Sequence, residues 1–294
     1  MGFLLLLTAA VFNITKSYGS KKISGRVSGF SETVDISLCR NILCTLIGAL
    51  IIACTSPIGF ILPTKGLIIC LFAGLAVGLN YVVWVLALKS GVYLFANATN
   101  TASFIIAVFA GIAFFDEKLT ALKALAILLI LTALLFMGKY QTGTRGKITP
   151  KHLVLLFLVF VSQGASSVSQ KWFTREFPEI PAHTYTLYSL LVSVIILAVF
   201  TLFIPNKPKM KSRVKSIRSF LPWVILMAVC FYATTFFQLA ASARLDAVVM
   251  YPVYNGILLL AGNLMAWFCF GEKPNKNSII GAVLVFSAIL LIGF

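Results

Sequence analysis

The sequence is poor in charged residues, and acidic residues are the scarcest of them. Only 11% of its 294 residues are charged and only 8 are Asp or Glu, whereas 60% are hydrophobic. A soluble domain of this length needs a polar coat that this composition does not supply. The composition therefore excludes a soluble globular protein and places the chain in a lipid bilayer.

The chain also lacks the residue spacing of a metal centre. It has 2 His and 6 Cys, and the cysteines lie inside apolar runs without the close pairs that metal sites use. Thiols in apolar surroundings are usually inert packing residues. We therefore expect no metal, no other cofactor and no enzymatic activity.

No acidic residue falls in the middle of an apolar run. All eight lie in connections or within a turn or two of the end of a run. An ionised side chain at mid-membrane costs about 2.5 to 3.5 kcal/mol, so where one occurs it usually marks a proton or cation site. This pattern argues against proton-coupled drug efflux through a membrane glutamate.

Ten apolar runs come close to the length that a bilayer-spanning helix needs, about 20 residues. The runs are continuous, whereas the strands of a membrane barrel would alternate, so we expect helices. The ten spans are 3–19, 34–54, 66–88, 91–114, 120–138, 152–174, 183–204, 220–241, 246–269 and 278–293.

The sequence repeats itself at a gap-free offset of 155 residues. Five spans fall in each copy, and because five is odd the second copy must enter the membrane from the opposite face. We therefore predict an all-α membrane protein of ten transmembrane helices in two inverted five-helix repeats, residues 1–140 and 141–294. The matching positions are Phe115-Asp116-Glu117-Lys118 with Phe270-Gly271-Glu272-Lys273, Lys16 with Lys171, Lys89 with Arg244, Asn100 with Asn255 and Gly138 with Gly293.

Basic residues are distributed unevenly between the two sets of connections. The odd-numbered connections hold 16 Lys and Arg, whereas the even-numbered ones hold 4, or 6 when Lys123 and Lys171 near the ends of spans 5 and 6 are counted with them. The positive-inside rule then places the odd connections in the cytoplasm and both termini outside. It also explains the basic run from Lys207 to Arg218 as a topology determinant, so we expect no nucleic-acid partner.

With these features the chain resembles the drug/metabolite transporter superfamily, in particular ten-helix EamA-type permeases built from two EamA repeats. The resemblance implies a multi-pass permease of the plasma, or bacterial inner, membrane. Members are usually described with both termini cytoplasmic, the reverse of the orientation that the charge count predicts. The likeness is carried by Arg40, the Lys89-Ser90-Gly91 turn, the acidic sequences that close spans 4 and 9, and Lys16 matched by Lys171.

The resemblance also implies a central cavity lined by spans 1, 3, 4, 6, 8 and 9. In span 6, Gln163, Ser166 and Gln170 share one helical face, and in span 9 Tyr251 and Asn255 do so. The same side chains could instead bond neighbouring helices, at about 0.6 kcal/mol each. The residues we predict to bind substrate are Tyr81, Trp84, Asn97, Asn100, Gln163, Ser166, Gln170, Tyr232, Tyr251, Tyr254 and Asn255.

Three basic residues inside or beside the spans have two interpretations. Lys16, Arg40 and Lys171 could extend their charges to the headgroups, or act as gate charges that an acidic residue reaches when one side closes. Arg40 could also hold span 2 against a helix end. Glu117 precedes span 5 and is expected to stabilise the N-terminus of that helix.

The sequence thus predicts a permease for a small neutral or zwitterionic metabolite, such as an amino acid or a nucleobase-like compound. Its partners would be that substrate and the lipid bilayer, and a monomer would suffice. Two alternatives stay open. One is an aromatic-cage carrier of organic cations, and the other is a membrane scaffold or lipid-handling protein.

Overall fold

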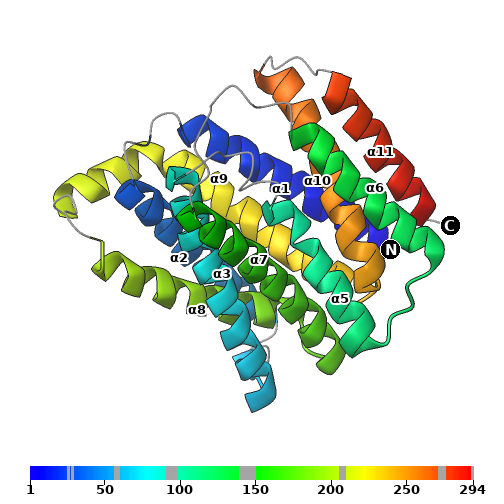
Figure 1. The fold of residues 1–294 in the computed structure, drawn as a ribbon. Helices are drawn as coiled ribbons and strands as arrows, with labels where there is room; N and C mark the ends of the chain where they lie inside the picture. Colours follow the sequence, from blue (N-terminus) through cyan, green and yellow to red (C-terminus); the bar gives the residue numbers. More distant parts are fainter. Residues whose placement is uncertain are drawn as a thin grey trace.

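The structure is a computed structural model that describes residues 1–24, 27, 30–55, 60–90, 99–138, 150–204, 210–270 and 276–292 (Figure 1). These residues form α-helices joined by short connections. The helices are α1 (Gly2–Ser24), α2 (Phe30–Thr55), α3 (Thr64–Ser90), α5 (Phe104–Phe115), α6 (Ala121–Gly138), α7 (Pro150–Glu176), α8 (Ala182–Leu202), α9 (Met210–Ser242), α10 (Ala247–Phe270) and α11 (Lys276–Ile292).

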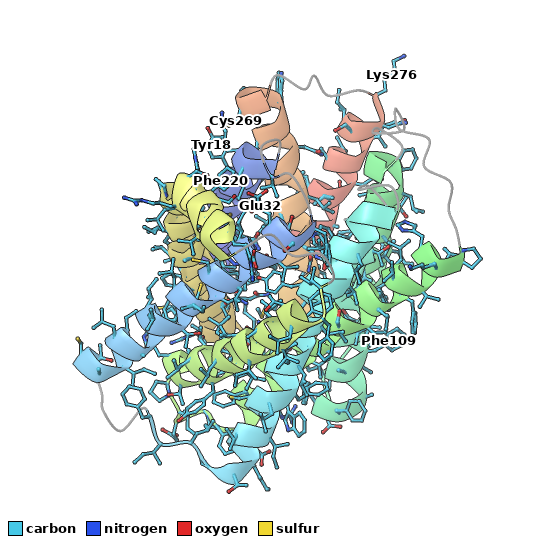
Figure 2. The ribbon with its side chains drawn as sticks, turned by 90° about the vertical axis from the view of Figure 1, so that its left-hand side faces the viewer. Tyr18, Glu32, Phe109, Phe220, Cys269 and Lys276 are labelled. Atoms are coloured by element: carbon cyan, nitrogen blue, oxygen red, sulfur yellow. The ribbon has the colours of Figure 1, made fainter. Side chains whose placement is uncertain are left out.

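The all-helical membrane fold predicted from the sequence is confirmed. Within the described residues, six helices are long and apolar enough to cross a membrane, and Thr99–Phe115, Ala121–Phe136 and Lys276–Ile292 are shorter apolar helices. Large apolar side chains cover the outer surface, where they would meet lipid. Phe109, which Figure 2 labels, is 67% exposed. The chain is an integral, multi-pass membrane protein.

One helix begins well before its predicted span. Helix α9 begins at Met210, ten residues before the predicted start, because part of the basic run ending at Arg218 continues as helix. In the fourth span, residues 91–98 lie outside the described residues, and with them the predicted site residue Asn97. The remaining helices begin and end within a few residues of the apolar runs.

The main packing surfaces join helices from different halves of the chain. Helix α1 packs on α9, α3 on α7 and α8, α2 on α8 and α9, and α6 on α11. Figure 1 shows two of these pairs, α1 (blue) beside α9 (yellow) and α6 (green) beside α11 (red). The two halves therefore interlock and share one interior.

Several of these contacts recur when each helix of the first half is exchanged with its equivalent in the second. The pair α1 and α9 corresponds to the pair α7 and α3. The pair α2 and α9 corresponds to α8 and α3, and the pair α1 and α10 corresponds to α7 and α5. All six pairs are in contact. A two-fold relation between the halves would produce this pattern. The inverted repeat and its division near residue 140 stay predictions.

Both termini lie at the same end of the molecule. Phe3 of α1, Thr120 before α6, Leu245 before α10 and Ile292 of α11 line one surface cavity, and Figure 1 marks the two termini near each other. We call this the terminal end and the other the opposite end. An even number of crossings produces this arrangement.

Glycines allow α3 to approach α8 closely. A Cβ atom built on Gly74 would lie 2.4 Å from Cβ of Val192, and one on Gly78 would lie 2.9 Å from Cγ2 of Ile196. The Gly74-x-x-x-Gly78 pair is thus a close-packing surface between membrane helices.

Candidate functional site

At the terminal end, an ion pair joins the two halves of the chain. The Nζ of Lys171, in α7, lies 3.3 Å from Oε1 of Glu117, which follows α5. Lys171 Nζ also donates to the carbonyl oxygens of Ser242 at 3.2 Å and Leu245 at 2.7 Å. The ammonium thus holds α7, the end of α9 and the α5–α6 connection together.

The Glu117 carboxylate caps α10, and this corrects the expectation that it stabilises the following helix, α6. The backbone N–H groups of Ala247 and Val248 each donate to Glu117, at 2.9 Å. A carboxylate at a helix N-terminus satisfies unpaired N–H groups and complements the helix dipole. At α6 the N-terminal bond is made by Thr120 Oγ1, which accepts from the N–H of Lys123.

A residue in the left-handed backbone conformation directs the Glu117 side chain toward α10. Asp116 has φ 53°, and the N–H of Glu117 turns back to the carbonyl oxygen of Gly111 at 3.0 Å. Residues with a side chain rarely adopt this conformation, and glycine adopts it freely. The equivalent position in the second copy is Gly271, so the sequence of both copies suits the same turn.

A cavity of about 440 Å³ opens beside this ion pair. Lys171 is the one predicted site residue in its lining, and Arg175 donates to the carbonyl oxygen of Phe115 at its rim. The predicted substrate residues of α3, α9 and α10 do not line it.

A second cluster surrounds Arg40 in the interior. The centre of its guanidinium lies 4.3 Å from the ring centroid of Tyr81 and 4.6 Å from that of Phe231. Its Nε and Nη2 atoms donate to Oδ1 of Asn41 at 3.2 and 3.1 Å. The side chain is 8% exposed and contacts α3 and α9, so the expectation that it holds a helix end is wrong.

Lys16 contacts the same aromatic ring from α1. Its Nζ lies 5.2 Å from the centroid of Phe231. Helix α1 continues for eight residues beyond Lys16, to Ser24, which is about 12 Å of helix. Lys16 therefore lies deeper than its place near the end of the predicted first span suggested.

Predicted residue Asn100 belongs to a hydrogen-bond network centred on Asn80, which the sequence analysis did not select. The Nδ2 of Asn80, in α3, lies 3.1 Å from Oγ of Ser162 and 3.3 Å from the carbonyl oxygen of Val159, both in α7. It lies 3.5 Å from Oδ1 of Asn100. An asparagine next to Tyr81 in an apolar span was the available signal.

Two predicted tyrosines of α10 make bonds between helices. The hydroxyl of Tyr251 donates to the carbonyl oxygen of Ser167 at 2.5 Å, and the hydroxyl of Tyr254 accepts from Nδ2 of Asn13 at 2.7 Å. Asn255, by contrast, donates one turn back, to the carbonyl oxygen of Tyr251, which is its one side-chain bond among the described residues. The tyrosines thus connect α10 to α7 and α1.

The polar face of α7 is partly buried, as its helical spacing predicts. Ser166 and Gln170 are buried and Gln163 is half-buried. The Oε1 atom of Gln170 is buried and has no hydrogen-bond partner among the residues that the structure describes. A buried acceptor without a partner is costly, which makes this position a candidate for solute contact.

Two predicted residues lie in apolar surroundings. Trp84 packs with Val83, Leu155 and Val159 between α3 and α7. Tyr232 is buried among residues of α2 and α8, and its hydroxyl lies 2.7 Å from Nδ1 of His183. Phe231, the residue before Tyr232, is the one that contacts the two interior cations.

Polar pairs also occur at the opposite end. Arg213 of α9 pairs with Asp35 of α2, and Ser216 donates to Glu32. Figure 2 labels Glu32, Phe220 and Tyr18, from α2, α9 and α1, in this part of the molecule. Asp35 thus provides an acidic partner for Arg213, one of the cations of the basic run.

The fold and the second half of the sequence match known proteins. A crystal structure of a protein 13% identical to this chain superposes with a TM-score of 0.75 and covers 99% of this chain and 95% of that one, which shows a shared fold. No curated protein matches the sequence. Residues 150–294 match the family described as the EamA-like transporter family. This chain therefore carries an EamA-like transporter family domain and is a membrane transporter.

Proposed function

We propose that the chain moves a small neutral or zwitterionic metabolite, such as an amino acid or a nucleobase-like compound, by alternating access. The observation that carries this proposal is the difference between Lys171 and its repeat equivalent Lys16. Lys171 is ion-paired to Glu117 at the terminal end. Lys16 instead contacts the ring of Phe231.

The difference supports two alternating states. If the halves are related by a two-fold axis, each end has one lysine that an acidic residue can reach. In this structure the terminal end has formed its pair. The acid equivalent to Glu117 is Glu272, which lies outside the described residues. Exchange of the two pairings would open one end and close the other.

The alternative of an organic-cation carrier fits the structure less well. The rings of Tyr81 and Phe231 already contact the guanidinium of Arg40, and Lys16 lies on the same Phe231 ring. An aromatic cage attracts a cation through the ring faces. Here two protein cations already use those faces and would repel a third.

Binding and flux of solutes test the proposal against the scaffold and lipid-handling alternative. The purified full-length protein is screened by thermal shift against a metabolite library, since a ligand of the folded state raises the melting temperature. Each hit is then loaded into proteoliposomes for counterflow. We expect at least one hit that exchanges across the membrane. No hit and no flux with any library compound would favour a scaffold.

A further inference from the structure

We propose that Arg40 and Lys16 bind an anionic oxygen group, a carboxylate or a phosphate, of the transported solute. The inference rests on the proposed transport function and narrows its substrate class. Among the compounds considered above, it selects zwitterions that carry such a group over neutral nucleobase-like compounds. We call Arg40 and Lys16 the cation pair.

The cation pair is assembled by four helices around one ring. Phe231 of α9 contacts Arg40 of α2 and Lys16 of α1, while Tyr81 of α3 contacts Arg40 from another side. The two rings lie edge to face, with centroids 6.0 Å apart. Figure 1 shows these four helices, α1, α2, α3 and α9, gathered in one part of the molecule. Both charges are thus held close together inside the bundle.

Asn41 orients the guanidinium from within α2. Its Oδ1 accepts both bonds from Arg40, and its Nδ2 donates to Oγ of Ser193 in α8 at 3.1 Å. Asn41 is fully buried, so its amide is fixed between two helices. A guanidinium has five N–H donors, and two bond this neutral oxygen.

The cation pair has no acidic partner in the part of the chain that the structure describes. The ion pairs found there join Lys65 to Glu176, Lys171 to Glu117 and Arg213 to Asp35. Asp35 lies five residues before Arg40 in α2, and its carboxylate is engaged by Arg213. The interior around Phe231 therefore carries an excess of positive charge.

Such an excess is unfavourable in a membrane interior unless something compensates it. A charged side chain at mid-membrane is costly on insertion scales, and contact with an aromatic face returns only part of that cost. The two rings and Asn41 thus compensate part of the cost of burying the Arg40 charge. Among the described residues, the Lys16 ammonium contacts the Phe231 ring alone. A solute anion would complete the compensation. An arginine fork also matches the two oxygens of a carboxylate or phosphate.

The first test compares ligands that carry an anionic oxygen group with analogues that lack it. The full-length protein is titrated, by thermal shift and tryptophan fluorescence, with phenylalanine against phenylalaninamide, benzoate against benzamide, and phenyl phosphate against phenol. We expect the anionic member of at least one pair to bind at least tenfold more tightly. Equal binding of both members in every pair, or no binding by any anion, would overturn the proposal.

The second test uses variants and a matched control. Arg40→Gln and Lys16→Gln should each weaken binding of the anionic probe by about tenfold to a hundredfold, the range for losing a charged hydrogen bond. Lys22→Gln changes net charge equally, but Lys22 is exposed at the end of α1, so its effect should be within twofold. Loss of binding in Lys22→Gln alone would contradict the assignment.

A third variant does not depend on the choice of ligand. Lys16→Glu places a carboxylate near Arg40 and should raise the melting temperature of the ligand-free protein above that of Lys16→Gln while abolishing anion binding. A lower melting temperature for Lys16→Glu than for Lys16→Gln would contradict the proposal that the site beside Arg40 is stabilised by an anion.

Two further measurements distinguish a solute anion from a lipid headgroup, and failure of the anion site from failure of the transport proposal. Titrations in nanodiscs of phosphatidylcholine with and without phosphatidylglycerol should give the same solute affinity. Displacement of the probe by phosphatidylglycerol would assign the cation pair to a lipid headgroup and overturn the solute proposal. Counterflow of neutral compounds only would refute the anion site while leaving transport intact.

Discussion

The ammonium of Lys171 lies 3.3 Å from the carboxylate of Glu117, and the two residues come from opposite halves of the chain. The same carboxylate accepts both N–H bonds at the start of α10. One acidic side chain thus couples α7 and α10 at the terminal end.

Glu117→Gln should destabilise the protein by roughly 3 kcal/mol or more, because it leaves the Lys171 ammonium, whose side chain is 12% exposed, without its charge partner. The matched control is Lys65→Met, which breaks the pair of Lys65 with Glu176, where Lys65 is 79% exposed. That change should cost at most about 1 kcal/mol. Denaturant unfolding of the purified variants measures both. Equal effects would show that the Glu117 pair contributes no more than a surface pair.

Asn80→Ala and Asn255→Ala should separate bonding between helices from ligand binding. Asn80 bonds α7 through Ser162 and Val159, so its loss should lower stability by about 1 kcal/mol. Among the described residues Asn255 bonds only its own helix, so Asn255→Ala should leave the melting temperature nearly unchanged.

For ligand binding we expect the opposite order. Asn255→Ala and Gln163→Ala should weaken binding of a hit from the metabolite library between several-fold and about a hundredfold. If Asn255→Ala unfolded the protein and left the affinity intact, Asn255 would be a bond between helices and not a binding residue.

Gly74→Ala should disrupt the contact of α3 with α8. The added Cβ would lie 2.4 Å from Cβ of Val192 and 2.7 Å from the carbonyl oxygen of Ser189, and such overpacking typically costs about 1 to 3 kcal/mol. Gly262→Ala adds the same atom to α10 where nothing lies within 4 Å. It should be neutral or stabilising by up to about 1 kcal/mol. Melting temperatures of the two variants check the contrast.

Substrate exchange should not require a proton gradient, because every acidic residue lies in a connection or near a helix end. Exchange in proteoliposomes, measured with and without an imposed gradient, checks this. Uphill transport driven by protons and abolished by replacing one acidic residue would show that the prediction is wrong.

A cysteine at residue 207, between α8 and α9, should be shielded from an impermeant thiol reagent in intact cells. The reason is the excess of Lys and Arg in the odd-numbered connections. A cysteine at residue 179, between α7 and α8, should be labelled. The exposed native thiols, Cys54 and Cys269, are first replaced by serine. The reverse labelling pattern would place both termini in the cytoplasm.

The sequence by itself determined the helices and their approximate bounds. A bilayer offers no hydrogen bonds to the backbone, so a continuous apolar run has to form a helix. The sequence also made the close-packing surface of Gly74 and Gly78 predictable, since small residues four apart let membrane helices approach closely. The repeat at 155 residues also identified Lys171 and Glu117 as positions of interest.

Only the tertiary structure decided which of these side chains meet. Lys171 and Glu117 are 54 residues apart in the sequence. The left-handed conformation of Asp116 directs the Glu117 carboxylate toward α10 and away from α6, the helix that follows it in the chain. Arg40 meets Tyr81 and Phe231 because α2 lies beside α3 and α9. Helical periodicity fixes the face on which a residue lies, but only packing fixes the partner of that face. The cation pair therefore emerged from the structure, whereas its two residues were visible in the sequence only as unpaired charges.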